Sequence, residues 1–363
     1  MKKLVFSGIL ALCPLSLAAA EDISSGIGTL SVTPVVQGLE GPWAFGFLPD
    51  GTILVTEREG HLVAVRDGAA KRVGGLPEVY DGGQGGLLDI LVPRDFASSR
   101  ELFFSYAKPM RGGAGTAVLR ARLSEDGSRL EAAETIFEMS RGSGGGRHFG
   151  SRLVEAADGT LFVTIGERGD AEAAQDLARH NGTVVRITRT GEVPGDNPFV
   201  GTSGARPEIW SYGHRNAQGA ALDRRGRLWV VEHGAKGGDE VNRIEKGANY
   251  GWPVISYGRH YSGAKIGEGT SKPGMEQPVF YWDPSIAPSG MTFLSGGPWD
   301  GDALVGSLKF DYISRLSGDP LREAEKLSSD ATQRVRDVEQ GPDGAIWFLS
   351  ETRGTLYRAS PPR

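Results

Sequence analysis

A turn followed by an apolar strand pattern recurs along the chain, and this repeat constrains the fold more than any other feature. Four copies are clear: LPDGTILVTE at 48–57, AADGTLFVTIGE at 156–167, DRRGRLWVVEHG at 223–234 and GPDGAIWFLSE at 341–351. Two weaker copies, RELFFSYA at 100–107 and GDALVGSLKF at 301–310, fill the gaps between them. Self-similarity of this kind indicates several copies of one supersecondary unit packed side by side.

The spacing of the copies predicts six such units. Their mean separation of about 59 residues exceeds a minimal four-stranded propeller blade by the length of loop insertions. The 54 glycines and 20 prolines among 363 residues leave few windows long enough for helices, and the only helix we expect is the insert at 169–179. The sequence therefore predicts an all-β protein, a six-bladed β-propeller with four-stranded antiparallel blades, forming one domain over residues 21–363. A sandwich, or several small β domains that share a turn, is the alternative; no linker or composition shift divides the chain to support it.

The first twenty residues, MKKLVFSGILALCPLSLAAA, have the pattern of a cleaved secretory signal. Two lysines precede a short apolar run, which ends in small residues before Glu21. The only cysteine, Cys13, lies in this segment, so we expect the exported protein to have no disulfide and no lipid or membrane anchor. The formal charge of −5 is spread without long runs, and it gives no sign of a nucleic-acid partner.

His148 stands in the glycine-rich stretch SGGGRHFGSRL, directly before a predicted strand. The glycines allow a ligand or a second backbone segment to approach closely. The hairpin that follows returns Glu167 toward the histidine, and a histidine oriented by a carboxylate is the usual general base. The alternative is a buried histidine whose ring is satisfied by a backbone carbonyl.

Basic side chains gather in two further segments, GHRNAQG and QRVRDV. Arg334 and Arg336 are spaced to share one face of a strand. Together with Lys309 from the preceding repeat, they would suit an anion that carries more than one carboxylate. The alternative is that the arginines form a solvated edge or pair with Asp337 and Asp223.

The segment EHGAKGGDE followed by GANYGWP offers Asp239, Glu240 and a glycine-rich backbone whose carbonyls can turn inward. Oxygen ligands without cysteine or a histidine cluster favour a hard cation, and calcium is preferred over zinc. No EF-hand spacing is present, so an ordinary acidic loop is the alternative.

Several of these stretches together resemble the soluble glucose/sorbosone dehydrogenases that depend on pyrroloquinoline quinone (PQQ), and in particular the periplasmic aldose sugar dehydrogenases. The resemblance covers nearly the whole chain after residue 20. The stretches that carry it are GLEGPWAFGFLPDG, GGQGGLLD, HFGSRL, AQDL, GEVPGDNPF, EIWSYGHRNAQG, GGDEVNRIEKGANYGWP, EQPVFYW and RVRDVEQGPDG. It implies a six-bladed propeller that binds PQQ and Ca²⁺, a periplasmic location, and oxidation of an aldose sugar at the anomeric carbon to the lactone.

The resemblance also implies roles for individual residues. His148 matches the catalytic base, Glu167 the carboxylate that holds it, and Arg215 a group that stabilises charge on the quinone. The residues that match PQQ contacts are Gln84, Arg215, Asn216, Lys309, Arg334 and Arg336. The carbonyls of Gly234 and Ala235 match ligands of the cofactor's calcium, and Glu240 with the carbonyl of Tyr250 matches ligands of a second, structural calcium. The alignment slips near Trp282, which is a candidate wall of the pocket.

The implied reaction removes the hydroxyl proton with His148 while a hydride passes to the quinone. Arg147, next to the base, is expected to lower the pKa of His148. No Cys-x-x-Cys-His haem attachment motif occurs, so we expect electrons to leave to an external acceptor, and we expect a monomer. Two alternatives stay open: a calcium-dependent lactonase on a similar propeller, and a propeller that binds without catalysis.

Overall fold

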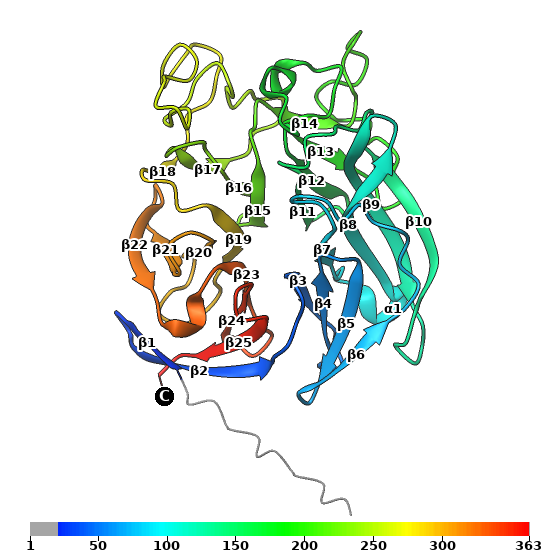
Figure 1. The fold of residues 1–363 in the computed structure, drawn as a ribbon, viewed down its shortest axis with the longest axis vertical. Helices are drawn as coiled ribbons and strands as arrows, with labels where there is room; N and C mark the ends of the chain where they lie inside the picture. Colours follow the sequence, from blue (N-terminus) through cyan, green and yellow to red (C-terminus); the bar gives the residue numbers. More distant parts are fainter. Residues whose placement is uncertain (1–20, 363) are drawn as a thin grey trace, which may run out of the picture.

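The protein is described here by a computed structural model of residues 21–362, so the predicted signal segment 1–20 lies outside the described residues. Six antiparallel sheets stand around a common axis like the blades of a propeller (Figure 1). Helix is almost absent from this part of the chain, which contains α1 (Phe96–Ser99) and the 3₁₀ turns η1 (Ala171–Gln175) and η2 (Asp330–Thr332). The predicted fold class is confirmed.

Each of the first three blades is a four-stranded sheet whose strands follow one another in sequence. Blade 1 contains β3 (Pro42–Phe47), β4 (Ile53–Glu57), β5 (His61–Arg66) and β6 (Ala69–Val73). Blade 2 contains β7 (Leu87–Leu91), β8 (Glu101–Met110), β9 (Gly113–Leu123) and β10 (Leu130–Glu138). Blade 3 contains β11 (Gly150–Glu155), β12 (Leu161–Ile165), β13 (Thr183–Ile187) and β14 (Ile209–Tyr212).

Blades 4 and 5 repeat this order, and blade 6 combines the two ends of the chain. Blade 4 contains β15 (Ala217–Leu222), β16 (Leu228–Glu232), β17 (Asp239–Arg243) and β18 (Phe280–Trp282). Blade 5 contains β19 (Pro288–Phe293), β20 (Ala303–Ser307), β21 (Ile313–Ser317) and β22 (Arg322–Leu327). Blade 6 contains β23 (Val335–Gln340), β24 (Ile346–Ser350), β25 (Thr355–Ser360), β2 (Gly28–Val36) and β1 (Glu21–Ser25).

The repeated sequence pattern corresponds to the second strand of every blade. The six strands are β4, β8, β12, β16, β20 and β24. Strands β4, β12, β16 and β20 are buried at every position. Such strands read as continuous apolar runs because both of their faces are covered, here by the neighbouring blades. The repeat therefore identified equivalent strands, one from each blade.

The ring is closed by the N-terminal strand β2, which pairs antiparallel with the last strand, β25 (Figure 1). Leu30 and Val32 on β2 are buried in the apolar cluster shared by blades 5 and 6, whereas Thr33 is exposed. This alternation matches a strand with one buried face. The closure was not predicted from the sequence.

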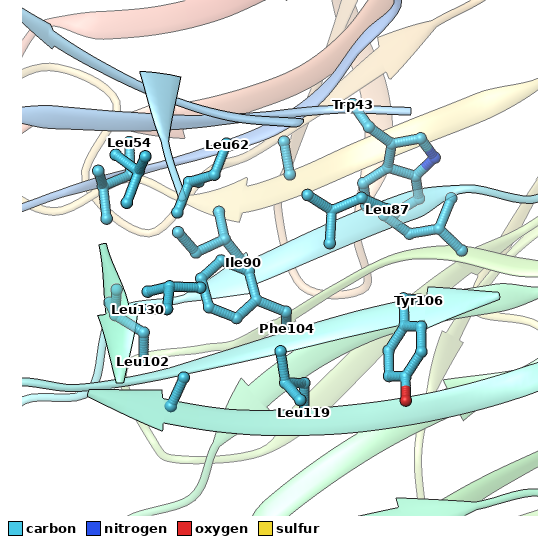
Figure 2. Packing of buried hydrophobic residues seen from close by; sticks show 14 of the residues in the cluster. Trp43, Leu54, Leu62, Leu87, Ile90, Leu102, Phe104, Tyr106, Leu119 and Leu130 are labelled. Atoms are coloured by element: carbon cyan, nitrogen blue, oxygen red, sulfur yellow. The ribbon is translucent and has the colours of Figure 1, made fainter. Parts of the chain in front are cut away.

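Apolar side chains fill the space between neighbouring blades. Figure 2 shows the cluster between blades 1 and 2, in which Trp43 and Leu54 from one sheet pack with Leu87, Ile90 and Phe104 from the other. Leu54 and Phe104 are fully buried. Packing of this kind holds the first strands of adjacent blades in contact around the axis.

Every first strand carries a shift in register near the end where it begins. The shifts lie between Pro42 and Ala44, Leu87 and Ile90, Gly150 and Leu153, Ala217 and Gly219, Pro288 and Met291, and Val335 and Asp337. A register shift changes the direction of the side chain at that point, and such irregularities are common beside active sites. All six occur at the same end of the blades.

The predicted helix at 169–179 is reduced to the short turn η1. The side chain of Gln175 donates hydrogen bonds to Asn249 Oδ1 (3.0 Å) and to the carbonyl of Trp252 (2.8 Å). These tertiary bonds hold the segment as a loop and override its local helix propensity. No helix within residues 21–362 is long and apolar enough to cross a membrane.

Candidate active site

A glutamate follows or ends the second strand in four of the six blades. Glu57 and Glu232 end β4 and β16, and Glu167 and Glu351 come just after β12 and β24. Each second strand is antiparallel to its first strand, so these glutamates lie at the end where the first strands begin. Carboxylates are thereby placed beside the register shifts.

A cavity of about 240 Å³ opens at this end of the propeller. Its lining residues come from the strands and adjoining loops of all six blades: Trp43, Arg58, Gln84, Leu88, Phe149, Gly150, Asn216, Gln218, His233, Ala287, Leu308, Arg334, Arg336 and Glu351. Trp43, Leu88, Gln218 and Arg336 occupy register shifts of their first strands. The shifts are therefore part of what directs side chains into the cavity.

The cavity is basic. Arg58, Arg334 and Arg336 contribute three guanidinium groups, and the only carboxylate among the lining residues is Glu351. Arg334 and Arg336 both reach Glu351 Oε2, at 3.3 and 2.9 Å. Burial would raise the pKa of Glu351, but the charges of Arg336 and Arg334 hold it below its ordinary range. A net positive cavity with one paired carboxylate suits an anionic ligand.

His148 and Glu167 form the close pair that the sequence predicts. Nδ1 of His148 lies 2.6 Å from Glu167 Oε1, and the other carboxylate oxygen accepts the backbone N–H of Gly169. The backbone N–H of His148 donates to Gln84 Oε1 at 2.7 Å. A histidine bound to carboxylate through Nδ1 keeps Nε2 as the available base. Nε2 makes no hydrogen bond with any residue of 21–362.

The surroundings of His148 favour the neutral imidazole. Its side chain is 12 % exposed. Burial lowers its pKa most, and the positive charges of Arg215 and Arg147 lower it further, against the opposing effect of Glu167. The expected influence of Arg147 has the predicted direction, although it is a minor contribution. A histidine with a lowered pKa is a ready proton acceptor at neutral pH.

Asn216 and Arg215 are adjacent in sequence but line different cavities. Asn216 lines the cavity and accepts the backbone N–H of Gly150 at 3.2 Å. Arg215 is 8 % exposed; its guanidinium donates to the carbonyl of His233 at 3.1 Å and leaves Nε without a partner in the described structure. The carbonyl of Arg215 accepts the N–H of Glu167 at 2.9 Å. The two segments that carry Arg215 and the histidine pair are thus joined directly.

A second, very small cavity of about 10 Å³ lies beside the first. Its lining includes Gly234, Glu240 and Tyr250, as well as Arg215 and Glu232. Burial, followed by the charge of Glu232, raises the pKa of Glu240 to about 8. The volume is about that of one small ion or water molecule. Ala235, on the same loop, is buried but is not among the lining residues.

Two candidate residues from the sequence lie outside the cavity lining, and the alternative pairing of Asp337 and Asp223 with the cavity arginines is not found among residues 21–362. Lys309 is exposed and does not line the cavity; its Nζ lies 4.9 Å from the ring centre of Phe310. Trp282 is buried between strands and donates to Glu323 rather than forming a pocket wall. Asp337 and Asp223 pair with Arg152 and Arg227, and so not with the cavity arginines.

The sequence reasoning missed Arg58, Trp43 and Glu351 as cavity residues. Glu351 had a visible signal, because the repeated strand ends in glutamate four times. Arg58 directly follows another of these glutamates, Glu57. Nη1 of Arg58 donates to the carbonyl of Gly83 at 2.7 Å, in the loop that carries Gln84. Trp43 had no signal, because a register shift cannot be read from residue alternation alone.

Comparisons with known proteins agree with this arrangement. A family profile described as Glucose / Sorbosone dehydrogenase matches residues 39–358. The chain is 43 % identical over 346 residues to the aldose sugar dehydrogenase YliI of Escherichia coli K12, covering 92 % of this chain and 93 % of the relative.

Solved structures show the same similarity. The soluble aldose sugar dehydrogenase of Escherichia coli in its apo form matches with a TM-score of 0.89 and 42 % identity, covering 92 % of this chain and all of the other. The PQQ-bound aldose sugar dehydrogenase of Streptomyces coelicolor matches with a TM-score of 0.75 and 28 % identity, over 91 % of this chain and 97 % of the other. The family resemblance of the sequence is confirmed: the chain belongs to the glucose/sorbosone dehydrogenase family.

Proposed function

We propose that this protein is a quinoprotein aldose sugar dehydrogenase that binds PQQ and Ca²⁺ and oxidises aldose sugars at the anomeric carbon to the lactone. The observation that carries the proposal is the His148–Glu167 pair next to a basic cavity, in a chain of this family. The PQQ-bound form of the Streptomyces coelicolor relative supports the choice of cofactor.

The cavity residues fit PQQ, which carries three carboxylates and two quinone oxygens. Arg58, Arg334 and Arg336 offer guanidinium groups for carboxylates, and Gln84 and Asn216 offer amides. We assign cofactor binding to Gln84, Arg215, Asn216, Arg334 and Arg336. Lys309 would join them only if its exposed side chain turned toward the cavity.

The small second cavity fits a hard cation. Glu240 is enclosed beside Glu232 and Asp239, and burial, followed by repulsion from these two carboxylates, raises its pKa to about 8. A bound Ca²⁺ would remove that repulsion and keep the carboxylate ionised, and calcium favours oxygen ligands of this kind. We assign Glu240 and the carbonyl of Tyr250 to a structural calcium, and the carbonyls of Gly234 and Ala235 to the calcium of the cofactor.

When bound, PQQ supplies the two-electron acceptor for the sugar's hydride, and calcium polarises a quinone oxygen as a Lewis acid. His148 takes the proton of the anomeric hydroxyl at Nε2, because Glu167 holds Nδ1. Glu167 then stabilises the imidazolium that forms. Arg215 supplies positive charge beside the base, and we assign it the stabilisation of negative charge developing on the cofactor.

The cavity disfavours a calcium-dependent lactonase. Such an enzyme needs carboxylate side chains that converge on a metal in the channel. Glu351 is the only lining carboxylate of the larger cavity, and two arginines already bind it. A purely binding propeller would leave the oriented base, His148 with Glu167, without a role.

We further propose that residues 1–20 are a cleaved signal, that residues 21–363 form one domain, and that the enzyme works in the periplasm as a monomer with an external electron acceptor. The signal pattern in the sequence supports the location. The closure of the ring by β2 supports a single folding unit.

Anaerobic mixing of the PQQ- and calcium-loaded protein with an aldose tests the reaction directly. We expect the absorbance of the oxidised quinone to disappear and one lactone to form per bound PQQ. A spectrum that does not change with any aldose, although PQQ is bound, would leave a cofactor-binding protein without the proposed activity.

A further inference from the structure

Arg168 is among the largest fully buried side chains of the protein, with 1 % of its surface exposed. It follows Glu167 directly in the sequence. Its guanidinium forms no ion pair with any carboxylate in residues 21–362, and its Nε has no hydrogen-bond partner there. Burial lowers the pKa of Arg168 to about 10.

The guanidinium contacts the residues on both sides of His148. Nη1 donates to the carbonyl of Arg147, and Nη2 donates to the carbonyl of Ala114 at 3.2 Å. The centre of the guanidinium lies 3.3 Å from the ring centre of Phe149, a residue that lines the cavity. Arg168 therefore fixes the chain immediately before and after the proposed base.

The backbone of His148 needs such support. Its φ of +55° lies in the left-handed region, which costs a residue with a Cβ about 1–2 kcal/mol. The backbone N–H of Arg168 donates to the carbonyl of His148 at 3.3 Å. A Cβ on Gly166 would lie 2.0 Å from that same carbonyl oxygen, so the two segments are packed as closely as their backbones allow.

Stability alone does not account for an arginine at this position. A buried charge without an acidic partner is costly, and an apolar side chain of similar volume in its place is often neutral or stabilising. Methionine could fill the same space against Phe149. Only a planar side chain with several donors can bind two carbonyls and cover the ring at once.

We infer that Arg168 is a positioning residue for the proposed base: its guanidinium holds the loop of 147–149 so that the His148 imidazole meets the Glu167 carboxylate. The inference rests on the proposed function for its catalytic consequence. Its structural consequence, the geometry of the His148–Glu167 hydrogen bond, is independent of cofactor and sugar.

The structural consequence is measured by proton NMR of the protein without cofactor. An imidazole N–H held by a carboxylate gives a low-field proton signal, and the His148→Gln variant assigns the one that belongs to His148. We expect this signal to vanish or broaden in Arg168→Met. The buried His214–Glu232 pair, with Nδ1 and Oε1 2.9 Å apart, is the internal control and should keep its signal.

The catalytic consequence is measured by a double-mutant cycle. Arg168→Met should lower kcat between about 10-fold and about 100-fold, the range expected when a catalytic group is misplaced. The KM for the sugar and the affinity for PQQ should stay unchanged. In the His148→Gln background the same substitution should change the residual rate by less than about two-fold, because Arg168 acts only through His148.

Two further variants separate positioning from general damage. Arg168→Lys keeps the charge but has a single donor nitrogen in place of the planar fork, so its kcat should lie between those of the wild type and Arg168→Met. It serves as the test if the methionine variant does not fold. Arg186→Met is the matched control, since Arg186 lies 5.1 Å over Trp210 in the same blade but pairs with Asp158 and Asp196. It should lose stability and keep its kcat.

An unchanged His148 signal in Arg168→Met would overturn the inference, whether or not the protein oxidises sugars. The inference would also be overturned if the losses of kcat from Arg168→Met and His148→Gln multiplied in the double variant, because Arg168 would then act independently of His148. A weaker PQQ affinity at unchanged kcat would show that Arg168 acts on the cavity through Phe149 and not on His148. That result would also overturn the inference. A wild-type protein with no sugar oxidation is a failure of the proposed function alone.

Discussion

At the scale of single residues, His148 combines a common side-chain arrangement with an uncommon backbone. The carboxylate partner at 2.6 Å fixes which ring nitrogen stays free. The left-handed φ and the bond from its N–H to Gln84 fix where the ring stands. Strained backbone of this kind persists only where several contacts impose it, and it gathers at functional sites.

Replacing His148 by Gln should separate binding from catalysis. The substitution removes the proton acceptor but no guanidinium of the cavity, so PQQ should bind with unchanged affinity. Turnover should fall by about 10²-fold or more, the usual contribution of a general base. Steady-state kinetics together with a PQQ titration measure both quantities, and turnover equal to that of the wild type would rule out the assigned role.

Arg147 should tune the pH at which the base works. The positive charge of Arg147 lowers the pKa of His148, and catalysis needs the neutral imidazole. The acid limb of kcat/KM should therefore lie below the ordinary histidine value of about 6.5. In Arg147→Gln the limb should move to higher pH, and salt should reduce the difference because Arg147 is exposed.

Arg141→Gln is the matched control for this shift. Arg141 is exposed on the same glycine-rich segment, and its removal changes the net charge equally without acting on His148. Its pH profile should coincide with that of the wild type. If both variants shift equally, the effect belongs to the net charge of the protein and not to Arg147.

At the scale of secondary-structure elements, the second strand of each blade could be predicted, whereas the closure and the shape of the cavity could not. Buried strands give continuous apolar runs that repeat along the chain. The pairing of β2 with β25 joins residues more than 300 positions apart. The local sequence around Leu30 and Val32 predicts a strand but does not indicate which strand it pairs with. The short turn η1 is set by the tertiary hydrogen bonds of Gln175, which local propensity does not contain.

The same distinction between local patterns and long-range pairing explains which site residues could be predicted from the sequence. His148 and Glu167 were predictable because one hairpin joins them. Arg334 and Arg336 were identified, but their partner was not, because β24 returns Glu351 to them instead of the nearer Asp337. Trp43 and Arg336 lie at register shifts of their first strands, and the position of such shifts cannot be read from residue alternation.

Leu30→Ala on β2 should test how much the closure contributes to stability. Leu30 is 1 % exposed in the apolar cluster shared by blades 5 and 6, and removing a buried leucine side chain costs about 2–5 kcal/mol. Thr33→Ala on the exposed face of the same strand should change the free energy of unfolding by less than about 0.5 kcal/mol. Urea unfolding followed by circular dichroism compares the two, and equal losses would show that β2 does not seal the ring.

At the scale of the whole molecule, the six blades surround two adjoining cavities, whose charged side chains are mainly positive in one and mainly negative in the other. Guanidinium groups from blades 1 and 6 line the larger cavity. Carboxylates Glu232 and Glu240 from blade 4 lie beside the smaller one. Opposite charges in two adjoining cavities suit a polycarboxylate ligand and a cation held next to each other.

Calcium should stabilise the protein through Glu240. A ligand that binds only the folded state at 100 times its Kd adds about 2.7 kcal/mol. We therefore expect calcium to raise the thermal midpoint of the PQQ-free protein, chelator to lower it, and Glu240→Gln to remove the part of the difference that comes from the structural calcium. Glu268→Gln, which removes an exposed carboxylate paired with Lys272, should retain it. An equal calcium response in both variants would place the ion elsewhere.

The most direct test of the central claim is a dye-reduction assay on the purified protein with glucose and a panel of other aldoses. PQQ and calcium are added separately and together, with chelator as the control and His148→Gln alongside. The account predicts turnover only when both are present, and its near loss in the variant. No turnover with any aldose, together with a thermal midpoint that PQQ does not change, would contradict it.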